Sequence, residues 1–223
     1  MKEMTTKIQY TEKVLLGFTY SIRLLILIEA ATAAWNKNLL LLFISIGILI
    51  ITFTPSFIAK NLKINLPIEF EFLVFVFITG ALFFGEIYKF YFRFWWWDIF
   101  LHALSSILLA FGGYLIVYIM YTQKKIRTKP RFVALFSFCF AVAIGALWEI
   151  VEFIVDISFG MNMQKSGITD TMSDLIVDTA GALAVSIAGF FYLKKKEPTK
   201  LFEKVLKIFI EKNRHLFKKR LRR

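Results

Sequence analysis

Acidic side chains and one histidine, set within or beside strongly apolar stretches, have the clearest potential for chemistry. The candidate catalytic or metal-binding residues are Asp98, His102, Glu149, Glu152, Asp174 and Asp178. A charged group inside a membrane costs about 2.5–3.5 kcal/mol even on lenient insertion scales, so such groups face a cavity or a partner. Carboxylates with one imidazole suit a divalent cation such as Mg²⁺, Mn²⁺, Ca²⁺ or Zn²⁺. The set therefore predicts metal ligands or acid and base groups, without dividing the roles.

Helical spacing gathers the acids into three stripes. The stripes are Asp98 with His102, Glu149 with Glu152 and Asp156, and Asp170 with Asp174 and Asp178. Residues three, four, seven or eight apart share one face of a helix. Gly113, Gly145 and Gly181 extend the stripes, and small residues let helices approach closely. We expect three helices to converge here with their carboxylates facing one another.

Simpler explanations compete with a metal site. Asp156 and Asp170 fall at the ends of predicted helices, where solvent exposure or capping of free N–H groups accounts for them. The other acids could share protons or water, or pair with basic side chains. The predicted outer region holds four of these, Lys37, Lys89, Arg93 and Lys165, which are too few for its acids.

The elements that position these residues are predicted to be membrane-spanning helices. Of the 223 residues, 58% are hydrophobic and only 20% charged, with a mean hydropathy of +0.64. Soluble domains average about 45–50% apolar residues. The single Cys139 excludes a disulfide framework and a cysteine metal cluster. Six stretches reach the 17–25 or so residues that a spanning helix needs, at about 14–34, 38–58, 69–90, 97–121, 131–157 and 171–193. We expect an all-α polytopic bundle over 1–193 and a basic amphipathic tail over 194–223.

The first stretch also has features of a cleavable signal peptide, since lysines precede an apolar run that ends near small residues. Arg23 interrupts the apolar core, and Glu29 lies where small neutral residues belong. These two residues favour a retained helix.

The basic residues predict the orientation. With six helices, 23 Lys and Arg lie on one side of the membrane and four on the other. Because cytoplasmic loops carry the excess of positive charge, both termini are predicted to be cytoplasmic. The acidic stripes then lie at the outer ends of their helices, in a multi-pass protein of the cell (inner) membrane.

The tail combines strong positive charge with regularly spaced apolar residues. Residues 194–223 hold 13 Lys and Arg against three acids. The apolar positions are Leu201, Phe202, Val205, Leu206, Phe209, Leu216 and Phe217. This pattern predicts an amphipathic helix on the anionic cytoplasmic leaflet. Lipid is thus the expected partner and nucleic acid is not; the oligomeric state is not predicted.

Several short segments resemble a known family. They are WWDIFLH at 96–102, WEIVEF at 148–153, GMNMQ at 160–164 and DTMSDLIVD at 170–178. Together they resemble the YjdF-like family of uncharacterised prokaryotic inner-membrane proteins, which is distantly similar to VanZ-like proteins. The resemblance implies a multi-pass membrane protein with a site at its acidic motifs, and it implies no reaction. The VanZ-like similarity would imply a role in the envelope or in glycopeptide tolerance.

Three functions fit these patterns. The first is a metal-dependent intramembrane hydrolase or transferase that acts on an envelope lipid or a lipid-linked substrate. The second is a cation or proton-coupled transporter or channel, in which the acids form a vestibule or relay. The third is a non-catalytic accessory protein. No acid lies in the inner half of the last three predicted helices, which favours an enclosed site over a path across the membrane.

Overall fold

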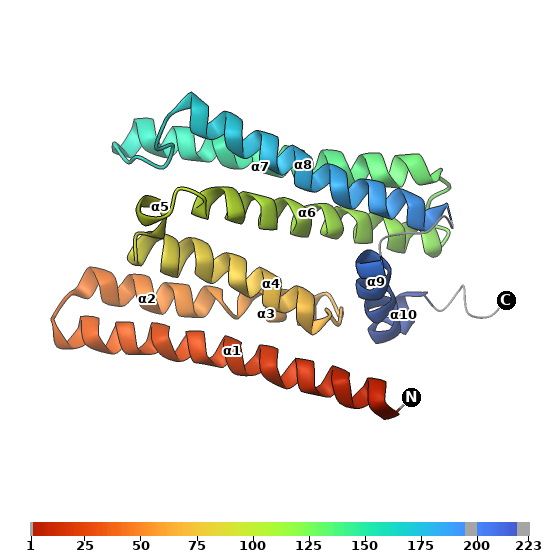
Figure 1. The fold of residues 1–223 in the computed structure, drawn as a ribbon, viewed down its shortest axis with the longest axis horizontal. Coiled ribbons are helices and arrows are strands. Elements are labelled where there is room, and N and C mark those ends of the chain that lie inside the picture. The colour runs from red at the N-terminus through yellow and green to blue at the C-terminus, as the bar shows by residue number, and fades with distance from the viewer. Residues whose placement is uncertain (1, 195–199, 218–223) are drawn as a thin grey trace. The chain divides into compact units, whose positions relative to one another are not determined.

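The described part of the protein, residues 2–194 and 200–217 of a computed structural model, contains helices and no strands (Figure 1). It divides into two compact units, Met1–Trp95 and Trp96–Arg223. Each unit contains three helical segments that are long and apolar enough to cross a membrane. All the candidate functional residues lie in the second unit.

The first unit is built on one long helix that packs beside two shorter ones. Its elements are α1 (Lys2–Trp35), α2 (Leu39–Ile51), α3 (Thr54–Asn61), α4 (Ile68–Ile78), the π-helix η1 (Thr79–Ile87) and α5 (Phe90–Arg93). Their shared core contains Ile22, Ile26, Ile48, Phe75 and Phe83. The second predicted span is therefore two helices, and the third ends as a π-helix.

Arg23 stabilises the break in the second span. Its Nε and Nη2 donate to the Thr52 hydroxyl at 3.2 Å and to the Thr52 carbonyl at 2.9 Å. The guanidinium also lies 3.9 Å from the centre of the Phe53 ring. Thr52 caps the carboxyl end of α2, where the helix dipole favours a cation. Glu29, which lies on α1 like Arg23, has a different partner. It accepts a hydrogen bond from the Tyr88 hydroxyl at 3.0 Å.

The second unit is a bundle of three long helices followed by two short ones. Its elements are α6 (Trp97–Thr122), α7 (Pro130–Phe159), α8 (Ile168–Leu193), α9 (Lys200–Lys212) and α10 (Arg214–Phe217). Each of the three long helices packs against the other two (Figure 1). Proline is favoured in the first turn, where α7 has Pro130, because no intrahelical donor is needed there. Gly160 ends α7 with a φ of +63°, which is the usual left-handed conformation of a helix cap.

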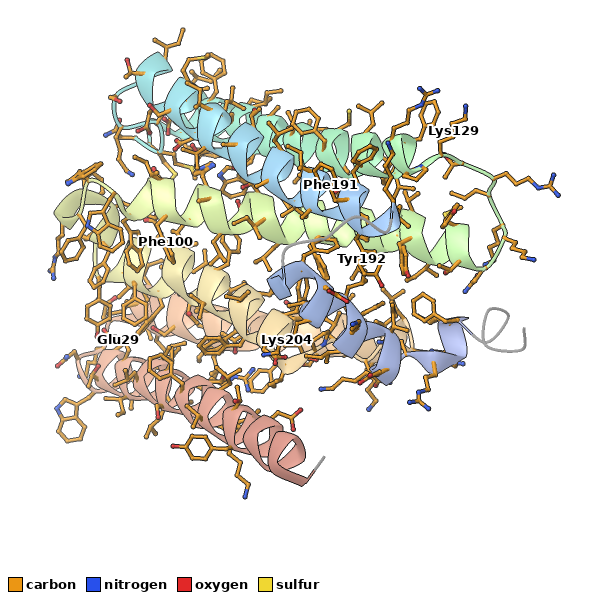
Figure 2. All side chains as sticks on the ribbon, turned by 45° about the vertical axis from the view of Figure 1, so that its right-hand side comes forward. Glu29, Phe100, Lys129, Phe191, Tyr192 and Lys204 are labelled. Atoms are coloured by element: carbon orange, nitrogen blue, oxygen red, sulfur yellow. The ribbon has the colours of Figure 1, made fainter. Side chains whose placement is uncertain are left out.

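The spans confirm an all-α polytopic membrane protein. They cover Tyr10–Trp35, Leu39–Asn61, Ile68–Ile87, Trp97–Thr122, Pro130–Phe159 and Ile168–Leu193. Their boundaries fall within about four residues of the expected ones. Apolar side chains such as Phe100 and Phe191 project from the helices (Figure 2), as a lipid environment requires.

The three glycines on the predicted stripes lie where helices are in contact. A Cβ atom added to Gly113, Gly145 or Gly181 would overlap the side chain of Phe140, Asp178 or Ser106 respectively. Each glycine is therefore required by the close approach of a neighbouring helix, as expected from the sequence.

The apolar face of the tail helix is buried in the second unit. Phe202, Leu206 and Phe209 are each at most 8% exposed. The Phe202 ring centre lies 5.1 Å from that of Tyr114 on α6 and 6.1 Å from that of Tyr192 on α8. Figure 2 shows Tyr192 at the end of α8 and Lys204 on α9. The apolar face of the tail helix thus contacts protein.

The basic face of the tail is exposed. Its described members are Lys204, Lys207, Lys212 and Arg214, and Lys207 pairs with Glu203 at 2.5 Å. The side chain of Leu201 and residues 195–199 and 218–223 lie outside the described part. The separation into a domain over 1–193 and a tail stays a prediction, and α9 and α10 belong to the same compact unit as α6, α7 and α8.

Leu206→Ala is expected to loosen the tail helix. Leu206 is fully buried, and a buried leucine truncated to alanine typically costs about 2–5 kcal/mol. Trypsin should then cleave the tail at least roughly tenfold faster in detergent, because cleavage follows the population of the open form. Glu211→Ala, at an exposed position of the same helix, is the control. Equal cleavage rates in the two variants would contradict the docked arrangement.

Candidate functional site

His102 lies at the centre of a cluster of carboxylates from α6, α7 and α8. Its side chain is 8% exposed, with Nδ1 3.3 Å from Oδ2 of Asp178. Its Nε2 lies 3.8 Å from Glu149 Oε1, and 3.9 Å from both Asp98 Oδ1 and Asp174 Oδ2. The convergence expected from the three stripes is therefore observed. The catalytic and metal-binding roles of these residues remain predictions.

Several carboxylate oxygens in the cluster are buried without a hydrogen bond. Glu149 is 4% exposed, and neither of its oxygens has a hydrogen-bond partner among the described residues. Oδ1 of Asp178, a residue 2% exposed, has none either. An ionised carboxylate that is removed from water without compensation is costly. Bound cations, protons or water would satisfy these oxygens.

A lysine from the loop between α7 and α8 pairs with one carboxylate of the cluster. Lys165 Nζ lies 2.6 Å from Oδ2 of Asp98. Across residues 2–194 and 200–217, no lysine or arginine forms an ion pair with the other predicted site acids, which are Glu149, Glu152, Asp174 and Asp178. Individual pairing with lysine or arginine therefore does not explain the cluster.

Two sets of side chains have the spacing that a metal ion requires. One is His102, Glu149 and Asp174, and the other is Asp98, Asp170 and Asp174. Within each set, one ligand atom per residue lies within 4.8 Å of the others. The first set combines imidazole with carboxylates, which suits Zn²⁺ or Mn²⁺, and the second offers only oxygen, as Mg²⁺ and Ca²⁺ prefer.

Two predicted site residues lie beside these sets. Asp178 contacts Nδ1 of His102, and an imidazole that donates from Nδ1 keeps Nε2 available as an acceptor. A carboxylate that orients a metal-binding histidine in this way is a common supporting group. Glu152 is buried on α7 and accepts a hydrogen bond from Trp148 Nε1 at 2.9 Å. The structure thus distinguishes the candidate metal ligands from the residues that lie beside them. Helical spacing in the sequence does not make this distinction.

The loop between α7 and α8 is fastened to both helices. Asp156 accepts hydrogen bonds from the backbone N–H groups of Met163 at 2.7 Å and Gln164 at 2.9 Å. The Gln164 side chain donates to Thr171 Oγ1 at 2.7 Å. Asp156 therefore supports a loop conformation, which replaces the solvated helix end considered from the sequence.

Asp170 and Lys165 belong to the cluster but were absent from the predicted site. Helix α8 begins at Ile168, three residues before the predicted start, so Asp170 lies in its first turn. The spacing of Asp170, Asp174 and Asp178 already contained this signal. Lys165 lies in the loop, where no helical period points to it.

The apolar helices and the buried carboxylate and histidine cluster define a polytopic integral membrane protein. The chain belongs to a family of predicted membrane proteins, DUF2238, whose family model matches residues 18–195. This is the YjdF family, so the resemblance seen in the sequence is confirmed at family level.

One relative is an uncharacterised protein of Thermotoga maritima, to which the chain is 36% identical over 118 residues. The matched region covers 50% of this chain and 55% of the relative, so the chain spans about half the length of the curated relative it matches. No solved structure matches the chain.

Proposed function

We propose that this protein is an integral-membrane enzyme that uses a divalent cation to act on an envelope lipid or a lipid-linked substrate. The observation that carries the proposal is Glu149, a buried carboxylate without a hydrogen bond, beside His102 and Asp174. These three side chains supply a compatible ligand set from three helices. A cation there would neutralise buried negative charge that the described lysines and arginines leave unpaired.

The remaining residues suit the chemistry of such a site. A bound cation polarises an oxygen of the substrate or activates water. Asp178 would hold the imidazole in the orientation that presents Nε2. Glu152, which is buried and 9% exposed, would accept or deliver a proton next to the ligand set.

In this proposal the helices span the inner membrane of the cell, and both termini are cytoplasmic. The distribution of Lys and Arg supports this orientation. The cluster then opens toward the outer leaflet, and the exposed lysines of α9 face the anionic inner leaflet. The VanZ-like similarity stays a prediction, and it favours envelope compounds as the first substrates to test.

The bundle supports an enclosed site better than a transport path. Toward the other end of the helices, Ser137 donates to the Ala110 carbonyl at 2.7 Å, and Ser186 donates to Ser137 at 3.3 Å. These hydroxyls are already bonded within the protein. The buried acids of the described second unit are Glu149, Glu152, Asp174 and Asp178. Three of them lie within 4 Å of His102, and Glu152 lies one helical turn from Glu149 on α7. A cation would find no further carboxylate along the described core.

The test is metal-dependent turnover in nanodiscs. Metal-free protein would receive Mg²⁺, Mn²⁺, Ca²⁺ or Zn²⁺ in turn, with phosphatidic acid, a polyprenyl diphosphate and phosphatidylglycerol as substrates. We expect one cation to support release of phosphate or head group, and Asp174→Asn to lower the rate at least about 100-fold, because it removes a ligand charge. Glu211→Gln, an exposed acid on α9, should keep full activity. Equal turnover by the Asp174 variant, or turnover without metal, would contradict the proposal.

A further inference from the structure

The two candidate ligand sets share one residue. Asp174 belongs both to the set with His102 and Glu149 and to the set with Asp98 and Asp170. Asp174 is buried, with only 2% of the residue exposed. Its Oδ2 atom lies 3.9 Å from His102 Nε2. A carboxylate has two oxygens, so a single buried aspartate can bind one cation on each side.

A lysine ammonium group is already associated with the second set. Lys165 Nζ lies 2.6 Å from Asp98 Oδ2, and the Lys165 backbone N–H donates to Asp170 Oδ2 at 3.1 Å. This region therefore accommodates positive charge in the structure.

The loop that carries Lys165 is held in place by hydrogen bonds that do not involve the Lys165 side chain. Asp156 holds Met163 and Gln164 by their backbone N–H groups, independently of the lysine side chain. The Lys165 ammonium can therefore leave Asp98 by rotation about its side-chain bonds while the loop keeps its place. Displacement of the lysine would free the oxygens of Asp98 for another cation.

We propose that the site takes two divalent cations bridged by Asp174, and that the Lys165 ammonium group stands in for the second cation in its absence. This inference rests on the proposed function, which requires only the first cation. Two cations about 3.5–4 Å apart are typical of enzymes that transfer or hydrolyse phosphate esters, since they stabilise both the attacking and the leaving oxygen. The substrate class is therefore a phosphate ester of a lipid, either a monoester or a diphosphate.

The reaction that this arrangement suits is hydrolysis. The oxygen of water forms a bond to phosphorus, while the bond from phosphorus to the leaving oxygen breaks and its electron pair stays on that oxygen. One water proton passes to the leaving oxygen, and the hydroxyl group remains on the phosphate. The products are a lipid alcohol or lipid monophosphate and inorganic phosphate, and no redox partner is needed.

Metal stoichiometry tests the inference without an activity assay. Full-length protein in nanodiscs would be equilibrated with Mn²⁺, and bound metal would be measured by elemental analysis and by electron paramagnetic resonance. We expect two Mn²⁺ per chain, with a spectrum broadened by coupling between neighbouring ions. Asp170→Asn should bind one Mn²⁺ and give the six-line spectrum of an isolated ion. Glu211→Gln, the control, should keep two.

A second variant tests the role of the lysine. Lys165→Met retains much of the side-chain length and removes the competing charge, so it should bind the second Mn²⁺ at least about tenfold more tightly, a change of roughly 1.4 kcal/mol. Unchanged affinity would overturn the stand-in role of Lys165. One ion in the wild type, unaffected by Asp170→Asn and lost in Glu149→Gln, would overturn the second site and leave the proposed function standing. No bound metal in any of the proteins would overturn both.

Discussion

Glu149→Gln is expected to lower the affinity for a divalent cation by at least about 100-fold and to leave the fold intact. Glutamine keeps the size of the side chain and removes its charge. Loss of a group that merely supports a metal ligand typically costs about 10–100-fold, so loss of a direct ligand should cost at least as much. Calorimetric titration of the metal-free protein with Mn²⁺ or Zn²⁺ measures the change in affinity.

The same substitution should raise the thermal stability of the metal-free protein. Neither oxygen of Glu149 has a hydrogen-bond partner among the described residues, so the variant loses no such bond and relieves a buried charge. Lower affinity with higher stability is the pattern expected when a residue is kept for function at the expense of stability. Glu211→Gln should change neither quantity. A variant that binds metal normally would remove Glu149 from the site, and one that unfolds would favour a structural role.

Gly145→Ala is expected to weaken metal binding although it removes no polar group. The added Cβ would overlap the carboxylate of Asp178, which must then move away from Nδ1 of His102. Loss of this supporting contact should lower metal affinity by about 10–100-fold. Overpacking at the contact between α7 and α8 should also reduce the free energy of unfolding by about 1–3 kcal/mol. Metal titration and thermal unfolding of one preparation give both values.

Gly112→Ala is the matched control on α6. A Cβ atom at Gly112 would meet nothing within 4 Å. The variant should bind metal like the wild type and should be at most about 1 kcal/mol more stable, because alanine favours a helix more than glycine does. If the two alanine variants behaved alike, the close contact between Gly145 and Asp178 would not matter to the site.

The sequence was sufficient to predict the spans and the convergence of the acids. Length and apolar composition determine whether a helix can cross a membrane, and both can be counted in the chain. The acids follow the helical period, so their spacing alone groups the side chains that face His102. Gly145 and Gly181 lie on the same faces, which indicated the close packing.

Some features depend on individual hydrogen bonds, or on which surface a side chain contacts. Hydropathy and helical spacing could not predict these features. Hydropathy is continuous across Thr52 and gives no sign of the break that Arg23 stabilises; the sequence signal for it is Pro55, in the first turn of α3. The π-helix differs from an α-helix in its hydrogen bonds and not in its composition. The apolar face of α9 looks the same in sequence whether lipid or protein covers it. Lys165 reaches Asp98 from a loop, where no periodic pattern applies.

The distribution of the cluster over three successive helices has a consequence for biosynthesis. Domains generally fold from the N-terminal end as the chain is made, so α6 and α7 are complete before α8 leaves the ribosome. At that stage His102 has Asp98 and Glu149 beside it, while Asp178 and Lys165 are still to come. The early hairpin therefore lacks the carboxylates of α8, and arrival of that helix completes the cluster around His102. A nascent chain interrupted near Gly160 would present this incomplete cluster to the proteases that clear unfinished membrane proteins.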